Sequence, residues 1–562
     1  MRRNAASPPR SLAASFARWV RSAGWALLVL TALSAWIGQE VYGRLIVPAP
    51  PLNFDEAAHS LPGYYVLRDI LALDLRALWG DFHIQTLWPP GFSLLQAPFL
   101  GVLGRSDESA RLFAYLMLVA TMLMGFPIAR LIAPNLAAPA TLLTGLITLT
   151  APGWLFVASW AMQETPVAFV SLVFFWLFLR AQHTGRLRWF ALSSVALYFL
   201  FLTKFNYAAF ALAASGLLHV LRSLGALRAR GASALATVMQ ESLALYAPFI
   251  GGVLFWFLGG TDIVPTEVKW RDFRFFVTNE SSGFAFWSAE NLLFYVRATL
   301  DWLMPSPWLA ALALLSAVWA LVRMRTPGVW LLASYFALGF VLTTLHPLKA
   351  PRYITPIFPP LWVLAGIGGA DFARWLLQHA ARANARRAIL VLLSASVVLA
   401  AVWSWATWLP RLEPVWAGNA AHDLRAAADQ IVRWQQPNRP LLIIGTFGEL
   451  SPPLFEWRLR PLPGFGNSPH PIQYDAPPVE GEDDLARVRR WLAEYPNAQV
   501  TVIRVDEGSP LYQTHDMQTK NAWRQALARA FIAAFEPHLT AQVAFPKSGL
   551  WIGYYDFTDA QP

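Results

Sequence analysis

Three acids and three basic residues stand at the ends of long apolar runs, where their side chains could take part in chemistry. The acids are Asp55, Glu56 and Glu164, and the basic residues are Lys204, Lys349 and Arg352. A carboxylate in such a place is either a general base or an interfacial charge that ends a helix. A cation there either binds a phosphate or pairs with one of the acids.

Eleven apolar runs must position these residues. Each has roughly 15–25 residues, enough to cross ~30 Å of hydrocarbon as a helix. The runs lie at residues 25–46, 110–131, 136–160, 163–181, 189–203, 205–222, 242–259, 301–322, 329–346, 354–376 and 388–409. The two runs that meet near Thr203 form either two helices or one broken helix. The pattern predicts a mainly α-helical, polytopic membrane domain over residues 22–409.

The composition supports a membrane protein. Hydrophobic residues make up 56% of the chain and charged residues only 14%, whereas a soluble domain carries about a quarter charged residues. Lipid must therefore cover much of the surface. The net charge of +10 does not indicate nucleic acid, because in such a protein the location of the charge matters more than its sum. The chain has no cysteine, which excludes disulfides and thiolate chemistry.

Arginines gather in alternate connections between the runs, and acids gather in the others. By the positive-inside rule, residues 1–21 lie in the cytoplasm and the tail 410–562 lies outside. The long outer loops are then residues 48–109 and 260–300. We expect an inner-membrane protein of the cell envelope whose candidate acids all lie on the extracytoplasmic face.

The tail and the first outer loop have structure of their own. In the tail, apolar strands at 441–445, 499–505 and 551–557 alternate with helices at 421–435, 483–494 and 520–536, which predicts a small α/β domain. In the loop, an amphipathic stretch at 61–78 and an apolar stretch at 93–103 predict two surface helices joined by a Trp-Pro-Pro turn at 88–90.

Four short motifs, in this order, resemble those of GT-C fold glycosyltransferases. They are Asp55-Glu56 with the later Pro89-Pro90, Trp160-Ala-Met-Gln-Glu164, Leu202-Thr203-Lys204, and Lys349-Ala-Pro-Arg352-Tyr353. The resemblance is strongest to protein O-mannosyltransferases and bacterial lipid A aminoarabinose transferases, and covers about residues 20–410. It implies the GT-C fold, a sugar donor on a polyprenyl phosphate, and a protein, lipid or glycan acceptor whose hydroxyl or phosphate receives the sugar.

The resemblance also implies roles for the motif residues in an inverting transfer. Asp55 would be the base, and Glu56 would either orient the loop or exchange roles with it. Glu164 would be the second acid, at a position where the family often has Asp. The residues that would hold the donor phosphate are Lys204, Lys349, Arg352 and Tyr353.

Other outer residues leave alternatives open. His59, His83, Trp270 and Arg271 are candidates for the acceptor side, although loop 260–300 fits a plain interfacial loop equally well. His59, His83 and His346 could hold a divalent metal with Asp55 or Glu164, but no ligand spacing marks a metal site. The alternative function is a transporter or flippase of a lipid-linked sugar, which internal repeats or mid-span acids would favour.

Overall fold

The structure is a computed structural model of the whole chain. It describes residues 24–86, 89–260, 265–278, 287–304, 306–346, 348–379, 383–408, 419–447, 449–462, 472–473, 484–495, 497–509, 511 and 522–557. The predicted cytoplasmic segment 1–21 and Trp88 of the Trp-Pro-Pro turn lie outside the described residues.

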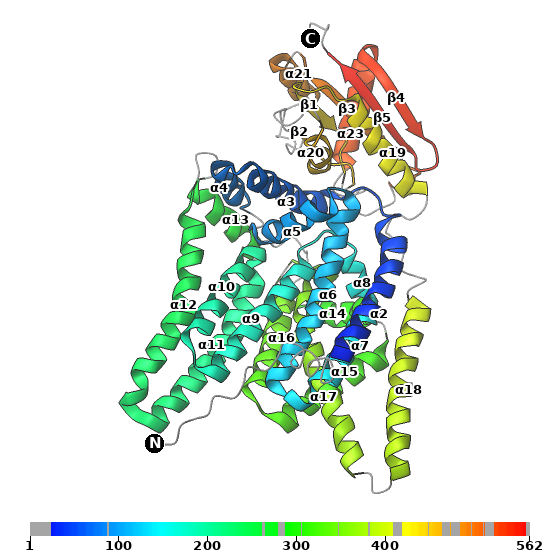
Figure 1. Ribbon diagram of the computed structural model, residues 1–562. Helices are drawn as coiled ribbons and strands as arrows, with labels where there is room; N and C mark the ends of the chain where they lie inside the picture. The colour runs from blue at the N-terminus through cyan, green and yellow to red at the C-terminus, as the bar shows by residue number, and fades with distance from the viewer. Residues whose placement is uncertain are drawn as a thin grey trace.

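Each apolar run of the sequence falls on a helix or on a bent pair of helices. The helices are α2 (Trp25–Val41), α6 (Asp107–Ile132), the pair α7 (Ala137–Leu149) and α8 (Pro152–Ala158), α9 (Glu164–Thr184), α10 (Leu187–Thr203), α11 (Phe205–Arg230), α12 (Leu235–Leu258), α15 (Pro307–Met324), α16 (Pro327–Leu345), α17 (Phe358–His379) and α18 (Ala383–Trp408). Among the described residues, seven helical segments are long and apolar enough to cross a membrane, or eight with the pair bent by 76°. The helices form one bundle (Figure 1).

Two breaks between helices show how the chain changes direction inside the bundle. Lys204 has an extended backbone, with φ −166° and ψ 108°, and separates α10 from α11. The two helices pack against each other, so the runs that meet near Thr203 form two helices. At the other break, Ala151 is extended and Pro152 opens α8, because a proline suits the first turn of a helix and disfavours a helical residue before it.

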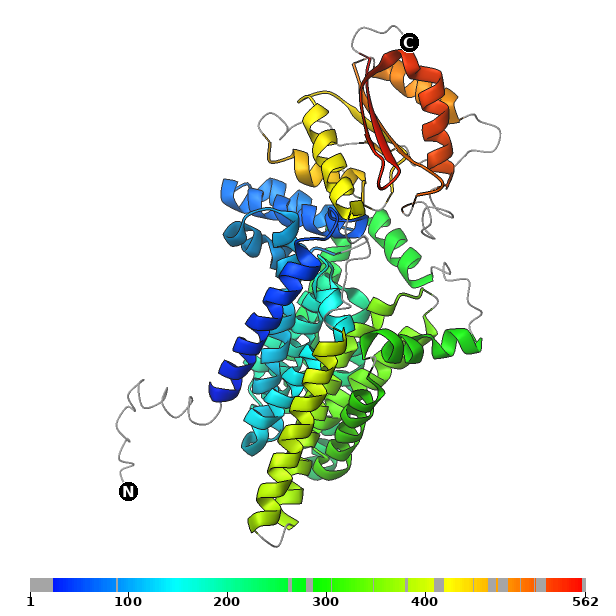
Figure 2. The same cartoon turned by 90° about the vertical axis from the view of Figure 1, so that its right-hand side faces the viewer.

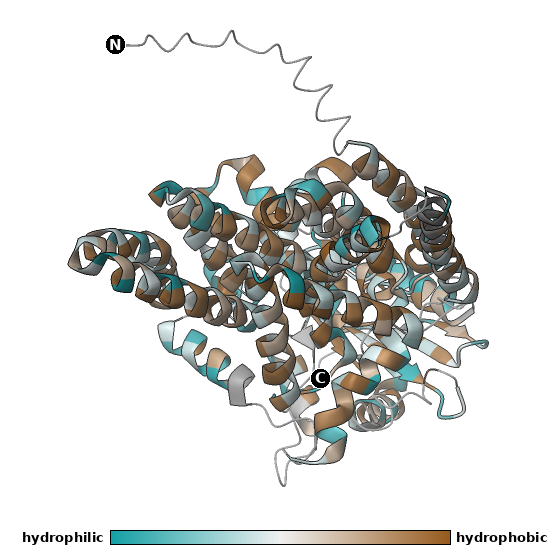
Figure 3. Ribbon diagram, turned by 90° about the horizontal axis from the view of Figure 1, so that it is seen from below, coloured by the Kyte–Doolittle hydropathy of each residue, from teal (hydrophilic) through white to brown (hydrophobic). Residues whose placement is uncertain are grey.

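The bundle has one continuous apolar core, to which most of the spans contribute. Helix α17 lies at its centre, and most of its side chains are buried between α7 and α15. Figure 3 shows apolar residues, in brown, spread over the helices of the bundle. This distribution suits helices that face protein on one side and lipid on the other.

The first outer loop contains three helices where the sequence predicted two. They are α3 (Phe54–Ala72), α4 (Leu75–Ile84) and α5 (Gly91–Leu103), and they lie across one end of the bundle (Figure 1). A capping box between Asn53 and Glu56 starts α3 early. Leu73 then adopts a left-handed backbone with φ 55°, and Asp74 caps α4. These local signals divide the stretch that amphipathicity alone presented as one helix.

The described parts of the second long outer loop, residues 265–278 and 287–300, contain two further helices. They are α13 (Thr266–Thr278) and α14 (Ala289–Ala298). A π-helical turn, Thr299–Leu303, joins α14 to the approach of α15.

The tail is an α/β domain, as predicted. Its helices are α19 (Asn419–Trp434), α20 (Pro452–Leu459), α21 (Asp484–Glu494) and α23 (Ala522–Phe535), and its strands are β1 (Leu441–Ile444), β2 (Ile472–Gln473), β3 (Gln499–Val505), β4 (Leu539–Phe545) and β5 (Leu550–Asp556). The strand order is β2-β1-β3-β5-β4. Strand β1 pairs in parallel with β2 and β3, and β5 pairs antiparallel with β3 and β4. Figure 2 shows the domain beyond the end of the bundle that carries α3 to α5.

A close approach of two spans makes the fold testable at Gly368 of α17. A Cβ atom there would lie 1.8 Å from the carbonyl oxygen of Ser316 in α15. We expect Gly368→Ala to push the helices apart and destabilise the protein by roughly 1–3 kcal/mol, measured as a lower melting temperature in detergent. Gly369→Ala is the matched control, because its Cβ would first meet the flexible Leu143 side chain at 3.3 Å. Equal melting of the two variants would contradict this packing.

Candidate active site

Two acids and two cations from four separate segments meet at the end of the bundle below α3. Arg352, in the 3-10 turn Pro351–Ile357, donates from Nη2 to Oδ2 of Asp55 over 2.8 Å. Lys204 donates from Nζ to Oε1 of Glu164 over 3.0 Å. The Nε atom of Arg352 lies 3.8 Å from the same Glu164 oxygen. The four side chains therefore form one cluster of alternating charge.

Local structure explains how each segment reaches this cluster. Asn53 caps α3 and places Asp55 in the first turn of that helix. Glu164 is the first residue of α9. At Gly91, the first residue of α5, a Cβ atom would lie 2.5 Å from the backbone nitrogen of Thr203. The absence of a side chain there lets α5 pack against the end of α10, directly before Lys204.

Burial gives the two acids different environments. The side chain of Glu164 is 1% exposed, whereas that of Asp55 is 35% exposed. Burial alone would raise the pKa of Asp55, but the neighbouring Arg352 guanidinium outweighs it and holds that pKa below the usual 3.8. Asp55 is therefore ionised near neutral pH and is the more exposed of the two acids.

Two aromatic or imidazole side chains border the cluster. His59 lies one helical turn after Asp55, and burial lowers its pKa to about 4, so its imidazole is neutral near pH 7. The ring of Tyr353 lies 4.9 Å from Nζ of Lys204. Tyr207 of α11 donates to the backbone carbonyl of Tyr353, which fixes this ring beside the cation.

Lys349 lies apart from the four-residue cluster. It donates to the backbone carbonyls of Thr343 and Thr344, and its Nζ lies 5.1 Å from the ring of Tyr295. It makes no ion pair with any acid in the part of the chain that the structure describes. Burial lowers its pKa to about 8, because no carboxylate offsets the cost of burying its charge.

Glu56 points away from the cluster and is fully engaged. Its Oε1 accepts from Nε of Arg111 over 2.9 Å and from the backbone N–H of Ala161 over 3.0 Å. Its Oε2 accepts from Nη2 of Arg111 over 2.9 Å and from the N–H of Asn53 over 3.1 Å. The two buried oxygens of Glu56 therefore accept from four donors.

Arg111 is a residue of this site to which sequence reasoning gave no role. It also donates to the carbonyls of Pro50 and Pro51, over 2.8 and 3.3 Å. Its signal in the sequence was a basic residue inside an apolar run, because such a charge needs a partner. The Glu56–Arg111 pair thus ties together residues 50–56, the start of α6, and the segment that leads into Glu164.

Three of the residues considered for the acceptor side lie away from the cluster. His83 accepts from Nζ of Lys269, which is fully buried and also donates to the carbonyl of Trp256 over 2.7 Å. Trp270 stacks on Phe257, with ring centroids 4.0 Å apart. Arg271, with a side chain 73% exposed, pairs with Asp272. These contacts join α13 to α4 and α12, and each has a structural explanation.

No group of three histidines, cysteines or acids lies together in the described residues in a way that could hold a metal ion. His346 accepts from the backbone N–H of Leu348. The metal site considered from the sequence therefore has no ready ligand set in this part of the chain.

An apolar cavity of about 440 Å³ opens beside the cluster. Lys204 and Tyr353 line it, together with the polar residues Asn206, Thr343 and His346. The rest is lined mainly by apolar side chains of α10, α11, α12, α13 and α16: Phe201, Phe205, Ala208, Ala209, Phe210, Leu212, Phe249, Val253, Phe273 and Leu342. Its shape offers room for a hydrocarbon chain whose polar head would lie at Lys204.

The sequence matches no protein-family model and no curated protein sequence, but the fold has solved counterparts. ArnT from Cupriavidus metallidurans bound to undecaprenyl phosphate superposes with a TM-score of 0.58 at 16% identity, over 96% of this chain and 99% of that chain. The Archaeoglobus fulgidus oligosaccharyltransferase tethered to an acceptor peptide gives 0.53 at 12% identity, over 96% and 74%. A complex of AglB from Archaeoglobus fulgidus with an inhibitory peptide and a dolichol phosphate gives 0.50 at 12% identity, over 97% and 75%. The chain therefore has the GT-C fold, which confirms the fold expected from the motifs.

The Glu56–Arg111 pair can be tested through stability. Arg111→Met leaves the Glu56 carboxylate buried without its cation, and we expect a loss of about 3–5 kcal/mol. The double variant Arg111→Met/Glu56→Gln removes the uncompensated charge and should recover part of that loss. Thermal unfolding in detergent measures both. A double variant less stable than Arg111→Met would contradict the role of the charge.

Proposed function

We propose that this protein is a membrane glycosyltransferase that moves a sugar from a polyprenyl phosphate to an acceptor hydroxyl or phosphate on the extracytoplasmic face. One observation carries the proposal. An ionised, reachable carboxylate, Asp55, lies in a cluster with Arg352 and Lys204, and Lys204 also lines an apolar cavity. A base, a phosphate site and a hydrocarbon site are what this transfer requires.

The reaction fits a single displacement with one base. Asp55 takes the proton from the acceptor hydroxyl as the acceptor oxygen bonds to the anomeric carbon. The bond from that carbon to the phosphate oxygen breaks at the same time, and its electron pair leaves with the polyprenyl phosphate. For a phosphate acceptor that is already ionised, Asp55 orients the nucleophile and takes no proton. Attack opposite the leaving group inverts the anomeric carbon.

The cations stabilise the leaving phosphate. Arg352 can give a phosphate two donors in one plane, whereas Lys204 acts as a compact charge. Glu164, buried beside both, keeps them in place when the site holds no phosphate. Lys349 is a third candidate, because it has no acid partner among the described residues and bonds the carbonyl of Thr343, which lines the cavity. Tyr353 offers its ring at the same edge.

Similar folds support a lipid-linked donor. The ArnT structure holds undecaprenyl phosphate, and the AglB structure holds a dolichol phosphate. Both ligands are long hydrocarbon chains with one phosphate. The apolar cavity next to Lys204 suits this class of molecule, and the Lys and Arg donors suit its head group.

Replacement of the base provides the direct test. We expect Asp55→Asn to lower transfer from a polyprenyl-phosphate sugar by about 10²- to 10⁴-fold, the usual contribution of a general base. The measurement is release of polyprenyl phosphate by purified protein in lipid vesicles, with melting temperature as the check on folding. Glu290→Gln, an exposed acid of α14, is the matched control and should keep wild-type activity. A folded Asp55→Asn protein with full activity would rule out this base.

The cavity predicts a dependence on the length of the lipid chain. Ala209 lines the cavity and its side chain is exposed, so Ala209→Trp should fill the space without disturbing the core. We expect KM for a long-chain donor to rise at least ten-fold, while a donor with a short chain is used as before. Ala213→Trp, one turn further along the same exposed face of α11, should change neither value. An equal effect on both donors would place the lipid chain elsewhere.

A further inference from the structure

A second, smaller cavity lies where the membrane domain meets the tail. It measures about 140 Å³ and shares the Glu56–Arg111 pair as one wall. Asn53 and Trp160 line it from the membrane domain, and Glu449 lines it from the tail. It is separate from the lipid cavity, with which it has no lining residue in common.

The polar groups in this cavity suit an uncharged, hydroxylated ligand. The side-chain oxygen of Asn53 caps α3, but its amide N–H₂ makes no hydrogen bond in the described residues. The indole N–H of Trp160 likewise has no acceptor there, and its ring lies beside Phe156 with centroids 4.9 Å apart. Glu449 adds a carboxylate that can accept from hydroxyls. An aromatic face with a few convergent donors and acceptors is the usual lining of a small-molecule site.

Two residues that line the cavity are close to the candidate acids in the sequence. Asn53 is two residues before Asp55, and Trp160 is four residues before Glu164. Glu56, in its wall, bonds both the Asn53 and the Ala161 backbone. A ligand in the cavity would therefore touch the segments that set the position of both acids.

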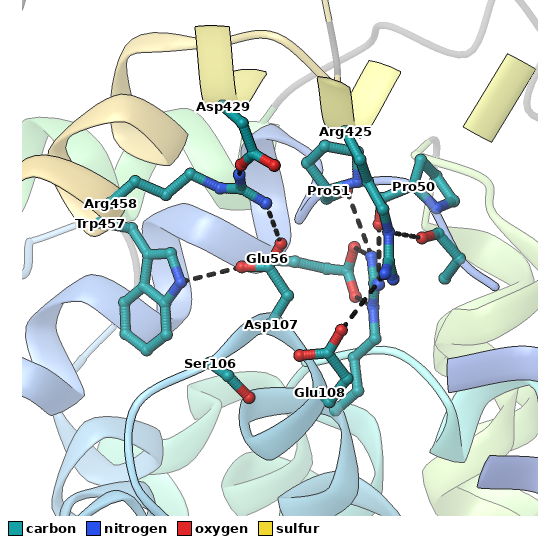
Figure 4. A network of polar contacts seen from close by, with 12 residues as sticks. Pro50, Pro51, Glu56, Ser106, Asp107, Glu108, Arg425, Asp429, Trp457 and Arg458 are labelled. Carbon is teal, nitrogen blue, oxygen red and sulfur yellow. Dashed lines mark hydrogen bonds and ion pairs between the residues drawn. The ribbon is translucent and has the colours of Figure 1, made fainter. Parts of the chain in front are cut away.

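Contacts from the tail hold this cavity together. Arg425 of α19 donates from Nε to the carbonyl of Ala49, a lining residue, over 2.6 Å, and its Nη1 lies 3.4 Å from Glu108 (Figure 4). Arg458 of α20 pairs with Asp107 of α6 over 2.7 Å at another point of the boundary between the tail and the membrane domain, which is called the seam below. The tail thus anchors one wall of the cavity and supplies Glu449 to another.

We propose that this cavity is a pyranose subsite, closed by Glu449 of the tail, that binds a neutral sugar unit of the acceptor. The statement that this sugar unit belongs to the acceptor rests on the proposed function, whereas the statement that the cavity binds a sugar does not. The tail then acts as a specificity element, since it contributes a residue that selects the acceptor.

Binding and kinetics test the proposal on the full chain. In a detergent without a sugar head group, methyl glucoside and methyl mannoside should stabilise the wild-type protein against heat, and acyclic xylitol should not. Glu449→Gln should raise the concentration for half-maximal stabilisation about ten-fold, as expected for loss of one charge-assisted hydrogen bond. In transfer assays the same variant should raise KM for a glycan acceptor by a similar factor and leave KM for the donor unchanged.

A matched control separates this role from support of the domain contact. Tyr65 of α3 donates to Glu456 of α20, so Tyr65→Phe weakens the seam without touching the cavity. It should leave the acceptor KM and pyranoside binding unchanged. Unchanged values in both Glu449→Gln and Trp160→Leu would overturn the subsite, as would equal stabilisation by xylitol. A wild-type protein that binds pyranosides but transfers no sugar would contradict the proposed function alone.

Discussion

The buried ion pair between Glu56 and Arg111 is the contact on which the placement of the candidate acids depends. Both side chains are about 3% exposed or less, and a charge buried without a partner would cost several kcal/mol. The Glu56 carboxylate and the Arg111 guanidinium must therefore stay in contact in the folded protein. Because Glu56 adjoins Asp55 and bonds the backbone at Ala161, this requirement fixes the start of α3 and the approach to Glu164 at once. The two acids can then face one cluster although 109 residues separate them in the chain.

Charge balance explains why the same cluster suits a phosphate. Asp55 and Glu164 offset Arg352 and Lys204, so the four residues are neutral together and tolerate the low dielectric at the end of the bundle. Glu164 is buried and holds both cations, whereas Asp55 shares only Arg352 and remains open to a second substrate. In the proposed transfer, a phosphate that enters takes donors from both cations while Glu164 still neutralises part of their charge. Burial thereby gives two similar carboxylates different environments, which supports the separate tasks that we propose for them.

The sequence predicted those features that follow from length, polarity and order along the chain. Apolar runs predicted the spans, and alternating strands and helices predicted the α/β tail. The break at Leu73 escaped prediction because a left-handed leucine has no sequence signature. Strand β4 has side chains that alternate between half-buried and exposed, a weaker signal than the buried runs of β1 and β3. Among the site residues, motifs named Asp55, Glu164, Lys204 and Arg352, which do meet. The motifs could not tell that Glu56 lies outside this cluster while Asp55 lies in it, because the partners of Glu56 are 55 and 105 residues away in the sequence.

The contacts between the tail and the membrane domain are of two kinds, exposed ion pairs and buried contacts. Arg425 and Glu108 are each more than a quarter exposed, and Asp429, a partner of Arg458, is about half exposed. Ion pairs with that much solvent contribute on the order of 1 kcal/mol or less each, whereas the Glu56–Arg111 pair is closed to water. Other contacts at this boundary are buried. Asp107, only 7% exposed, accepts from Arg458 and from the indole N–H of Trp457, and apolar side chains of the first outer loop and of the tail form one buried cluster. The tail is therefore held by buried contacts as well as by exposed ion pairs. Asp107, which receives Arg458, begins α6, the same helix that carries Arg111, so the tail is bound to the segment that also holds Glu56.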